Sequence, residues 1–65
     1  MELKNKVKEL RARHNLNQTD LAKLVSVSRQ TIGQIEKGDY SPSVMLALKI
    51  AKALNTTVDE VFYIV

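Results

Sequence analysis

Four polar side chains in the segment RQTIGQIEK carry groups that can hydrogen-bond to the edges of nucleic-acid bases. Arg29 can offer two donors to O6 and N7 of guanine, and Gln30 or Gln34 can bind N6 and N7 of adenine in a bidentate manner. The methyl group of Thr31 could meet the methyl group of a thymine. On a helical wheel Gln30 and Gln34 point away from the two isoleucines of the segment, with Arg29 and Thr31 on the flanks. We therefore expect these four residues to read bases.

Gly33 lies in the middle of the same polar face. A glycine inside a helix costs about 1 kcal/mol relative to alanine, so some benefit must offset it. A surface pressed close to a phosphate or a base would supply that benefit, and we expect such a close approach at this position.

These residues must be positioned by residues 17–37, NQTDLAKLVSVSRQTIGQIEK, which read as two short amphipathic helices joined by a tight turn. The apolar positions are Leu21, Ala22, Val25, Val27, Ile32 and Ile35. A second helix that shows a polar row beyond a rigid first helix suits the major groove of DNA. Polar residues alone are equally typical of a solvated face, but the two-helix pattern favours the groove.

Phosphate groups are expected at helix starts, where free backbone amides and the helix dipole attract anions. Helices start near Gln18, Ser28 and Ser43, which makes these residues candidates for holding the DNA backbone. Lys37 and Tyr40 are further candidates. Ser28 and Ser43 also fit simple helix caps, a role that is compatible with phosphate binding.

The sequence predicts five short helices in one domain, residues 1–65. Asn5 is expected to cap the first helix, Asn17 and Asp20 to form a capping box on the second, and Thr57 and Glu60 a capping box on the last. The first helix is expected over about 6–14. The second is expected to begin at 18, and the third to be capped at 28 and to stop at Gly38. The fourth is expected over about 43–54 and the fifth over 58 to about 62. The final residues, 62–65, have strong β character.

Composition narrows the classes of function. The 65 residues include no cysteine, which excludes disulfides and thiolate metal sites, and the apolar runs are too short for a membrane span. No secretory leader is recognisable, so we expect a cytoplasmic protein. We also expect no cofactor, no metal and no small-molecule ligand. The net charge is +3, and all ten Lys and Arg residues precede Ala53, which favours contact of the earlier part with nucleic acid.

The helix at about 43–54 is apolar nearly all round, so one small core cannot cover it. Either the apolar tail could fold back over the rest or a second copy of the chain could cover it. A two-fold dimer would span two DNA half-sites roughly 34 Å apart on a palindromic operator. The expected dimer interface comprises Met45, Val61, Phe62, Tyr63, Ile64 and Val65.

Catalysis finds little support in the sequence. His14 is the single histidine and is expected to cover the edge of the core, while Asp59 and Glu60 suit a helix N-terminus. No nucleophile with a base, no phosphate loop and no cluster of metal ligands is visible, so we expect a protein that is not an enzyme.

Several spaced elements resemble the phage repressor and Cro-like helix-turn-helix family, over almost the whole chain. The matching pieces are Leu10-Arg11, Leu16-Asn17-Gln18, Leu21-Ala22, Val27 to Ile32, Ile35 to Gly38, Pro42-Ser43 and Ile50-Ala51. The resemblance implies an all-α, five-helix domain of the lambda-repressor type that binds double-stranded DNA through its third helix. It assigns base contacts to Arg29, Gln30 and Gln34 and a phosphate contact to Gln18. It also implies a pair between Arg11 and Glu36.

One residue departs from that family's pattern. The turn between the second and third helices usually carries glycine where this chain has Ser26, and a left-handed serine would cost roughly 1 kcal/mol.

Taken together, these features predict a transcriptional regulator, a repressor acting as a homodimer. The alternative is an antitoxin-like or adaptor module that uses the same scaffold and its apolar tail to bind a protein.

Overall fold

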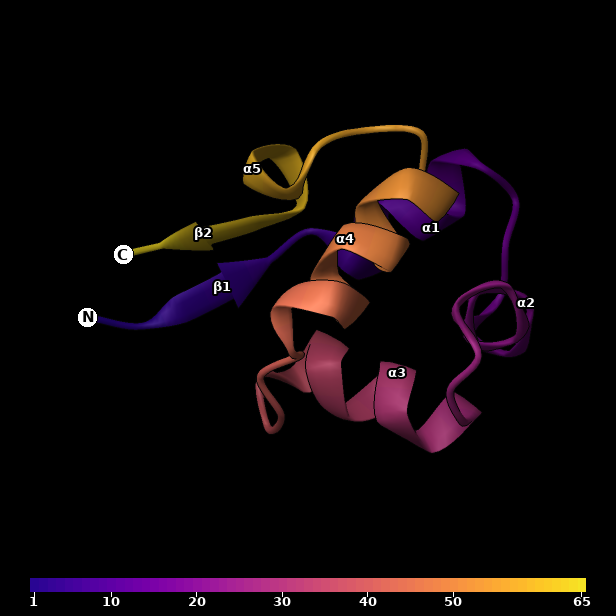
Figure 1. Cartoon of the computed structure of the whole chain (residues 1–65), viewed down its shortest axis with the longest axis horizontal. Coiled ribbons are helices and arrows are strands. Elements are labelled where there is room, and N and C mark those ends of the chain that lie inside the picture. Colours follow the sequence, from indigo (N-terminus) through magenta and orange to yellow (C-terminus); the bar gives the residue numbers. More distant parts are fainter.

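Five helices pack around one core, and a two-stranded sheet joins the two ends of the chain (Figure 1). The computed structural model describes all 65 residues. In chain order the elements are β1 (Leu3–Asn5), α1 (Val7–Arg13), α2 (Gln18–Val25), α3 (Arg29–Lys37), α4 (Val44–Ala53), α5 (Val58–Val61) and β2 (Phe62–Ile64). The predicted five-helix fold is confirmed, and none of the helices has the length and apolarity needed to cross a membrane.

The core is built only from hydrophobic side chains, and every helix contributes to it. Leu21 and Val25 of α2 are buried with Ile32 and Ile35 of α3, as their spacing predicts. The full set of buried residues is Val7, Leu10, Leu21, Ala22, Val25, Ile32, Ile35, Leu46, Ile50, Ala51, Leu54, Val61 and Phe62. No polar residue belongs to this set, so packing of these hydrophobic groups is the main source of stability.

Local side-chain bonds fix where α2, α3 and α4 begin. Asn17 Oδ1 accepts from the Asp20 amide at 2.7 Å, and Asp20 Oδ2 accepts from the Asn17 amide at 3.0 Å, which confirms the predicted capping box. Ser28 Oγ accepts from the Thr31 amide at 3.1 Å, and Ser43 Oγ caps α4 in the same way. These bonds satisfy amides that the helices themselves leave free.

The expected cap of the first helix is wrong, and the last helix has Thr57 as its N-cap but lacks the expected capping box. The N-cap of α1 is Lys6, and Asn5 lies in β1, although its Oδ1 still accepts from the Val7 amide at 3.1 Å. The Asn5 amide group instead donates to the Ile35 carbonyl at 2.9 Å, which ties β1 to α3. Thr57 makes no capping bond through its side chain, because the Glu60 amide bonds to its backbone oxygen instead.

The turn between α2 and α3 places Ser26 in the left-handed region, with φ 61° and ψ 43°. This is the conformation that glycine adopts without strain and serine adopts at a cost of roughly 1 kcal/mol. The fold keeps it because the turn closes with a bond from the Val27 amide to the Ala22 carbonyl at 3.0 Å. Gly38 ends α3 at φ 83°, as predicted.

The predicted terminal strand forms, and it pairs with a strand at the other end that was not expected. β1 and β2 are antiparallel, with Leu3 opposite Ile64 and Asn5 opposite Phe62. Beyond the strands, the amide of Glu2 and the carbonyl of Val65 are bonded at 2.8 Å, and the reverse pair at 2.9 Å. Both chain ends therefore lie side by side (Figure 1).

The burial of residues 61 and 62 changes the predicted dimer interface. Val61, the last residue of α5, is fully buried, and Phe62, the first residue of β2, is 9% exposed, and both side chains belong to the chain's own core. Neither side chain can supply the contact surface expected of it. His14 also differs from expectation: it lies one residue beyond α1 and is exposed rather than packed against the core.

Candidate nucleic-acid interface

A shallow polar hollow of about 590 Å³ lies along the exposed side of α3 and has no hydrophobic lining. It brings together three predicted base-reading residues, Arg29, Gln30 and Gln34, with two predicted phosphate contacts, Gln18 and Lys37. Gly33 and Asp39 complete the lining. Residues from the start of α2 and the whole length of α3 thus converge on one surface.

The amphipathic character of α3 explains this convergence. Ile32 and Ile35 are buried against α2, which leaves Arg29, Gln30 and Gln34 on the exposed side. The first turns of both helices face the hollow through Gln18 and Arg29. The N-terminal ends of the two helix dipoles therefore add positive potential near Gln18 and Arg29.

The other predicted site residues lie outside the hollow. Thr31 is half-buried, and its Oγ1 lies 2.9 Å from Ser28 Oγ, so both hydroxyls are engaged with each other. Ser43 is exposed, and its Oγ accepts from the Leu46 amide. Tyr40 is exposed in the loop after α3 and lines a small crevice beside the two-stranded sheet of β1 and β2.

Asp39 is a member of the hollow that sequence reasoning missed. Its amide donates to the Gln34 carbonyl at 2.9 Å, which folds the chain back over the end of α3. A carboxylate here can accept a hydrogen bond from N4 of cytosine, and it repels phosphate. Its place directly after the helix-ending Gly38 was the available signal, because the residues following such a cap turn back toward the last helical turn.

A hydrogen-bonded cluster of three side chains, Arg11, Glu36 and Gln18, supports the hollow from behind. The predicted pair forms: Arg11 Nε donates to Glu36 Oε2 at 2.8 Å and Arg11 Nη2 donates to Glu36 Oε1 at 3.2 Å. Gln18 Nε2 also donates to Glu36 Oε1, at 3.0 Å. Arg11 further donates to the Leu16 carbonyl at 3.0 Å. One carboxylate therefore joins α1, α2 and α3.

The cluster is well shielded, with the Arg11 and Glu36 side chains only 13% and 7% exposed. The hydrogen bond to Glu36 raises the pKa of Arg11; burial opposes this shift and the charge of Glu36 adds to it. A group whose folded pKa is raised contributes stability that is lost only as the pH rises through that pKa. For an arginine this lies above the range in which proteins are studied, so the charge of Arg11 is constant in practice.

Nothing inside the chain requires glycine at position 33. A Cβ atom placed there would meet only Gln18 Nε2, at 3.7 Å, which is an ordinary van der Waals contact. The cost of a mid-helix glycine is therefore not offset by packing within the domain. The expected close approach of a phosphate or base over the middle of α3 stays a prediction.

Comparison with known proteins places this geometry in a family. The helix-turn-helix family description matches residues 7–61. The chain is 55% identical over 62 residues to the uncharacterized HTH-type transcriptional regulator YgzD of Bacillus subtilis, covering 95% of this chain and 94% of that relative.

Two solved structures share the fold. The restriction-modification controller protein C.AhdI from Aeromonas hydrophila is similar with a TM-score of 0.80 and 34% identity, over 85% of this chain and 83% of that one. The DNA-binding domain of the P22 c2 repressor gives a TM-score of 0.80 and 30% identity, over 83% of this chain and 71% of that one.

The family match spans all five helices, and the polar hollow is lined by residues of α2 and α3, the two helices that the turn at Ser26 joins. The curated relatives that the chain matches are described as HTH-type transcriptional regulators. The chain belongs to the helix-turn-helix family of DNA-binding transcriptional regulators.

Proposed function

We propose that this protein binds a specific double-stranded DNA sequence with α3 in the major groove and represses transcription as a homodimer. The observation that carries the proposal is the polar hollow, in which Arg29, Gln30 and Gln34 share one exposed surface with Gln18 and Lys37. A helix fits the major groove, and these side-chain types are those that read base edges there.

Each base-reading residue has a distinct partner in this proposal. Arg29 binds guanine through two donors, and Gln30 or Gln34 binds adenine through its amide. Thr31 contacts a thymine with its methyl group, because its hydroxyl is engaged by Ser28. Asp39, at the edge of the hollow, disfavours phosphate at its own position and thereby helps to set the register of the helix in the groove.

The DNA backbone is held from both sides of α3. Gln18, Ser28 and Ser43 lie at the starts of three helices, where free amides attract phosphate. Lys37 and Tyr40 contact the backbone near the other end of α3. The bond from Gln18 to Glu36 uses one of its two amide hydrogens, so the second remains available to a phosphate oxygen.

The regulatory role is supported by the relatives. One structural neighbour is the DNA-binding domain of a repressor, and another is a controller protein of a restriction-modification system. A single half-site read by about four side chains gives little specificity, whereas two copies on a palindromic operator read two half-sites roughly 34 Å apart. The exposed apolar side chains of α4 are suited to holding two copies together.

Selection of bound sequences from a random DNA pool tests the proposal. The expected result is a palindrome whose half-sites contain guanine and adenine, bound far more tightly than a scrambled duplex, with affinity that falls steeply as salt rises. A mobility-shift titration of the selected site against its scrambled version is the control. Absence of binding to any duplex at low salt would overturn the proposal, since phosphate contacts alone give measurable affinity there.

A further inference from the structure

A groove between α2 and α4 lies apart from the surface that we assign to DNA. Its volume is about 260 Å³, and its lining comprises Leu24, Ser26, Lys49, Lys52 and Ala53. None of these residues lines the polar hollow along α3. The α2–α4 groove is thus a second surface of the domain, with its own set of side chains.

One side chain of the α2–α4 groove is a leucine that the core does not use. Leu24 is 60% exposed, although Leu21, Ala22 and Val25 of the same helix are buried. A single exposed leucine is common on protein surfaces and does not define a site. Covering it would nevertheless be favourable, because burial of apolar surface stabilises a contact. The residues around Leu24 therefore decide what kind of molecule could cover it.

The groove is bordered by positive charge. Lys49 and Lys52 line it and are exposed, no acidic residue lines it, and Lys23 is exposed beside Leu24 in the sequence. None of the three lysines takes part in an ion pair of the chain. Lys23 and Lys52 lie in the last turns of their helices, where a cation favours the helix dipole. The dipole does not account for Lys49, which lies before the last turn of α4.

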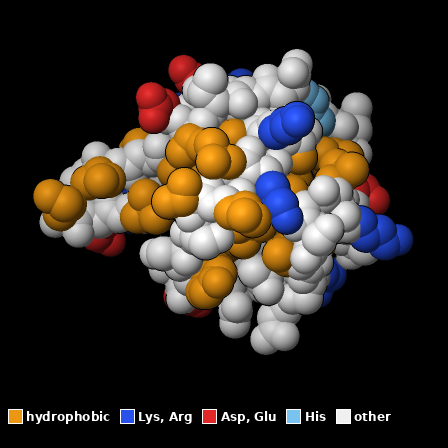
Figure 2. Space-filling view, viewed as in Figure 1, with side chains coloured by type: hydrophobic (Ala, Val, Ile, Leu, Met, Phe, Trp, Pro, Cys, Tyr) orange, Lys and Arg blue, Asp and Glu red, His pale blue; other side chains and the backbone are white.

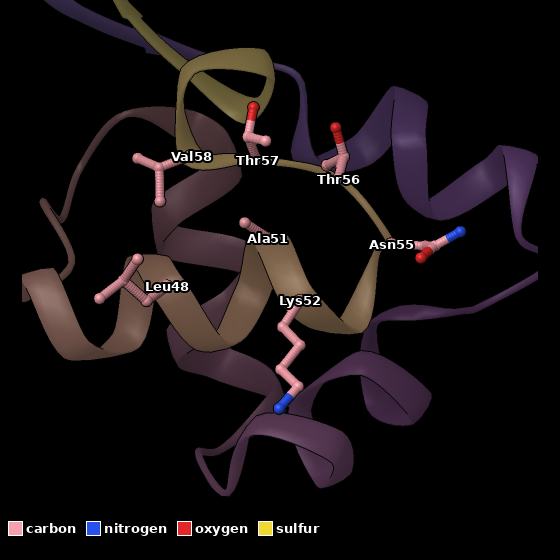
Figure 3. Close-up of a pocket in the computed structure, with 7 residues that line it drawn as sticks. All are labelled: Leu48, Ala51, Lys52, Asn55, Thr56, Thr57 and Val58. Atoms are coloured by element: carbon pink, nitrogen blue, oxygen red, sulfur yellow. The ribbon is translucent and has the colours of Figure 1, made fainter.

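Lys52 stands between the α2–α4 groove and a wider depression between α4 and α5 (Figure 3). Its side chain extends away from Thr56 and Thr57, toward α2 (Figure 3). Figure 2 shows basic side chains standing among hydrophobic ones over α4. Lysines in such a setting offer apolar stems to a partner and keep their ammonium groups free for its charges.

We propose that the α2–α4 groove binds an acidic segment of another protein, with an apolar side chain of that segment against Leu24 and its carboxylates paired with Lys49 and Lys52. The basic border and the apolar lining are complementary to a segment that carries both kinds of side chain. The inference goes beyond the proposed function, because it adds a protein partner and requires neither DNA nor a second copy.

Two other occupants fit the α2–α4 groove less well. Small-molecule pockets enclose their ligand within about 300–1,000 Å³, and the groove is smaller than that range. A DNA backbone is held by polar, hydrated surfaces, whereas Leu24 and Ala53 make part of this lining apolar. A protein segment uses the leucine and the lysines together.

Peptide titration tests the proposal on the full chain. The probe is a short synthetic peptide in which glutamate and leucine recur at helical spacing, and its matched version carries glutamine in place of every glutamate. Fluorescence anisotropy of the labelled peptide gives the Kd, and amide NMR shifts of the protein locate the contact. The expected shifts centre on Leu24, Lys49 and Lys52. The glutamine version should bind about tenfold or more weakly, because it cannot pair with the lysines.

Variants with matched controls assign the contact to individual residues. Lys49→Glu and Lys52→Glu should each raise the Kd about fivefold or more, whereas Lys8→Glu, at an exposed lysine of α1, should leave it within about twofold. Leu24→Gln should also raise the Kd, whereas Met45→Gln, at an exposed apolar residue outside the groove, should not. Circular dichroism checks that each variant is folded.

Three outcomes would overturn the proposal. The first is equal affinity for the glutamate peptide and its glutamine version, and the second is a set of shifts centred on the polar hollow or on Met45. The third is loss of duplex DNA affinity in the Lys49 and Lys52 variants with no peptide binding, which would assign the groove to nucleic acid. DNA reading by α3 is tested separately by sequence selection, so failure of one proposal leaves the other standing.

Discussion

The helices α3 and α4 each bury an apolar face in the same core, yet they present opposite surfaces to solvent. Outside its buried Ile32 and Ile35, α3 displays the polar lining of the hollow, while α4 exposes Val44, Met45 and Leu48. The first surface suits a hydrated, charged partner and the second a dry protein contact. One small domain therefore separates its two kinds of binding onto two neighbouring helices.

The two faces also differ in how they are supported. The α3 surface is braced from behind by the cluster of Arg11, Glu36 and Gln18, whereas the exposed side chains of α4 make no hydrogen bond to any other element. Changes behind α3 should therefore affect folding and DNA contact together. Changes on the outer face of α4 should affect association alone.

The largest expected effect is in the hydrogen-bonded cluster of Arg11, Glu36 and Gln18. Glu36→Ala should lower the free energy of unfolding by about 3–5 kcal/mol, because it leaves the shielded Arg11 without its partner. Urea denaturation followed by circular dichroism measures the change. Glu9→Ala, which removes the exposed pair with Arg13, is the control and should cost at most about 0.5 kcal/mol. An equal loss of unfolding free energy in the two variants would mean that the cluster does not stabilise the position of α3.

A smaller effect is expected on the reading face. Arg29→Ala should cost about 1–3 kcal/mol of discrimination at one base pair and leave the free energy of unfolding unchanged, because the side chain is exposed. Affinities for the selected site and its single-base variants measure it. Lys37→Ala should instead weaken binding uniformly and reduce the salt slope by about 1. Loss of folding in the Arg29 variant would show that this residue is structural.

Gly33→Ala should move stability and DNA affinity in opposite directions. The free energy of unfolding should rise by up to about 1 kcal/mol, because the added methyl group has room and alanine favours the helix. DNA affinity should fall if the middle of α3 approaches its partner closely. Gly38→Ala is the contrasting control: its φ of 83° should make it destabilising by about 1 kcal/mol. Unchanged DNA affinity for the Gly33 variant would argue against a close approach there.

The smallest expected effect is on the outer face of α4. Leu48→Gln should alter the free energy of unfolding of the dilute monomer by less than about 0.5 kcal/mol, because the side chain is more than half exposed. Ile50→Ala, two residues away and fully buried, should cost about 2–5 kcal/mol. Thermal unfolding at low protein concentration compares the two. A large cost for the Leu48 variant would mean that this face already packs within the chain.

Features set by neighbouring residues could be predicted from the sequence. The capping box at Asn17, the cap at Ser28 and the left-handed Gly38 depend on side chains within a few positions, so residue type and spacing are sufficient. The polar row of α3 follows from helical periodicity in the same way. The pair of Arg11 with Glu36 was implied by the family resemblance rather than by local chemistry.

Features that depend on distant segments were not predicted. The strand β1 exists because Leu3–Asn5 meets Phe62–Ile64 from the other end of the chain, and neither segment signals that meeting alone. The same pairing sets Phe62 opposite Asn5 and places Asn5 in β1 rather than at the N-cap of α1, which is Lys6. Asp39 entered the hollow because the chain folds back after α3. In each case tertiary contact decided between conformations that local propensity left open.

The two-stranded sheet of β1 and β2 holds the two ends together, so the backbone is almost a closed ring. Glu2 and Val65 already exchange two hydrogen bonds, so a short peptide linker could connect the ends without disturbing the native pairing. Cyclisation would lower the conformational entropy of the unfolded chain and leave the folded state unchanged. It would therefore raise the free energy of unfolding. The loop at residues 39–43, remote in sequence from both ends, would then be a natural place to open new termini and rearrange the order of the helices.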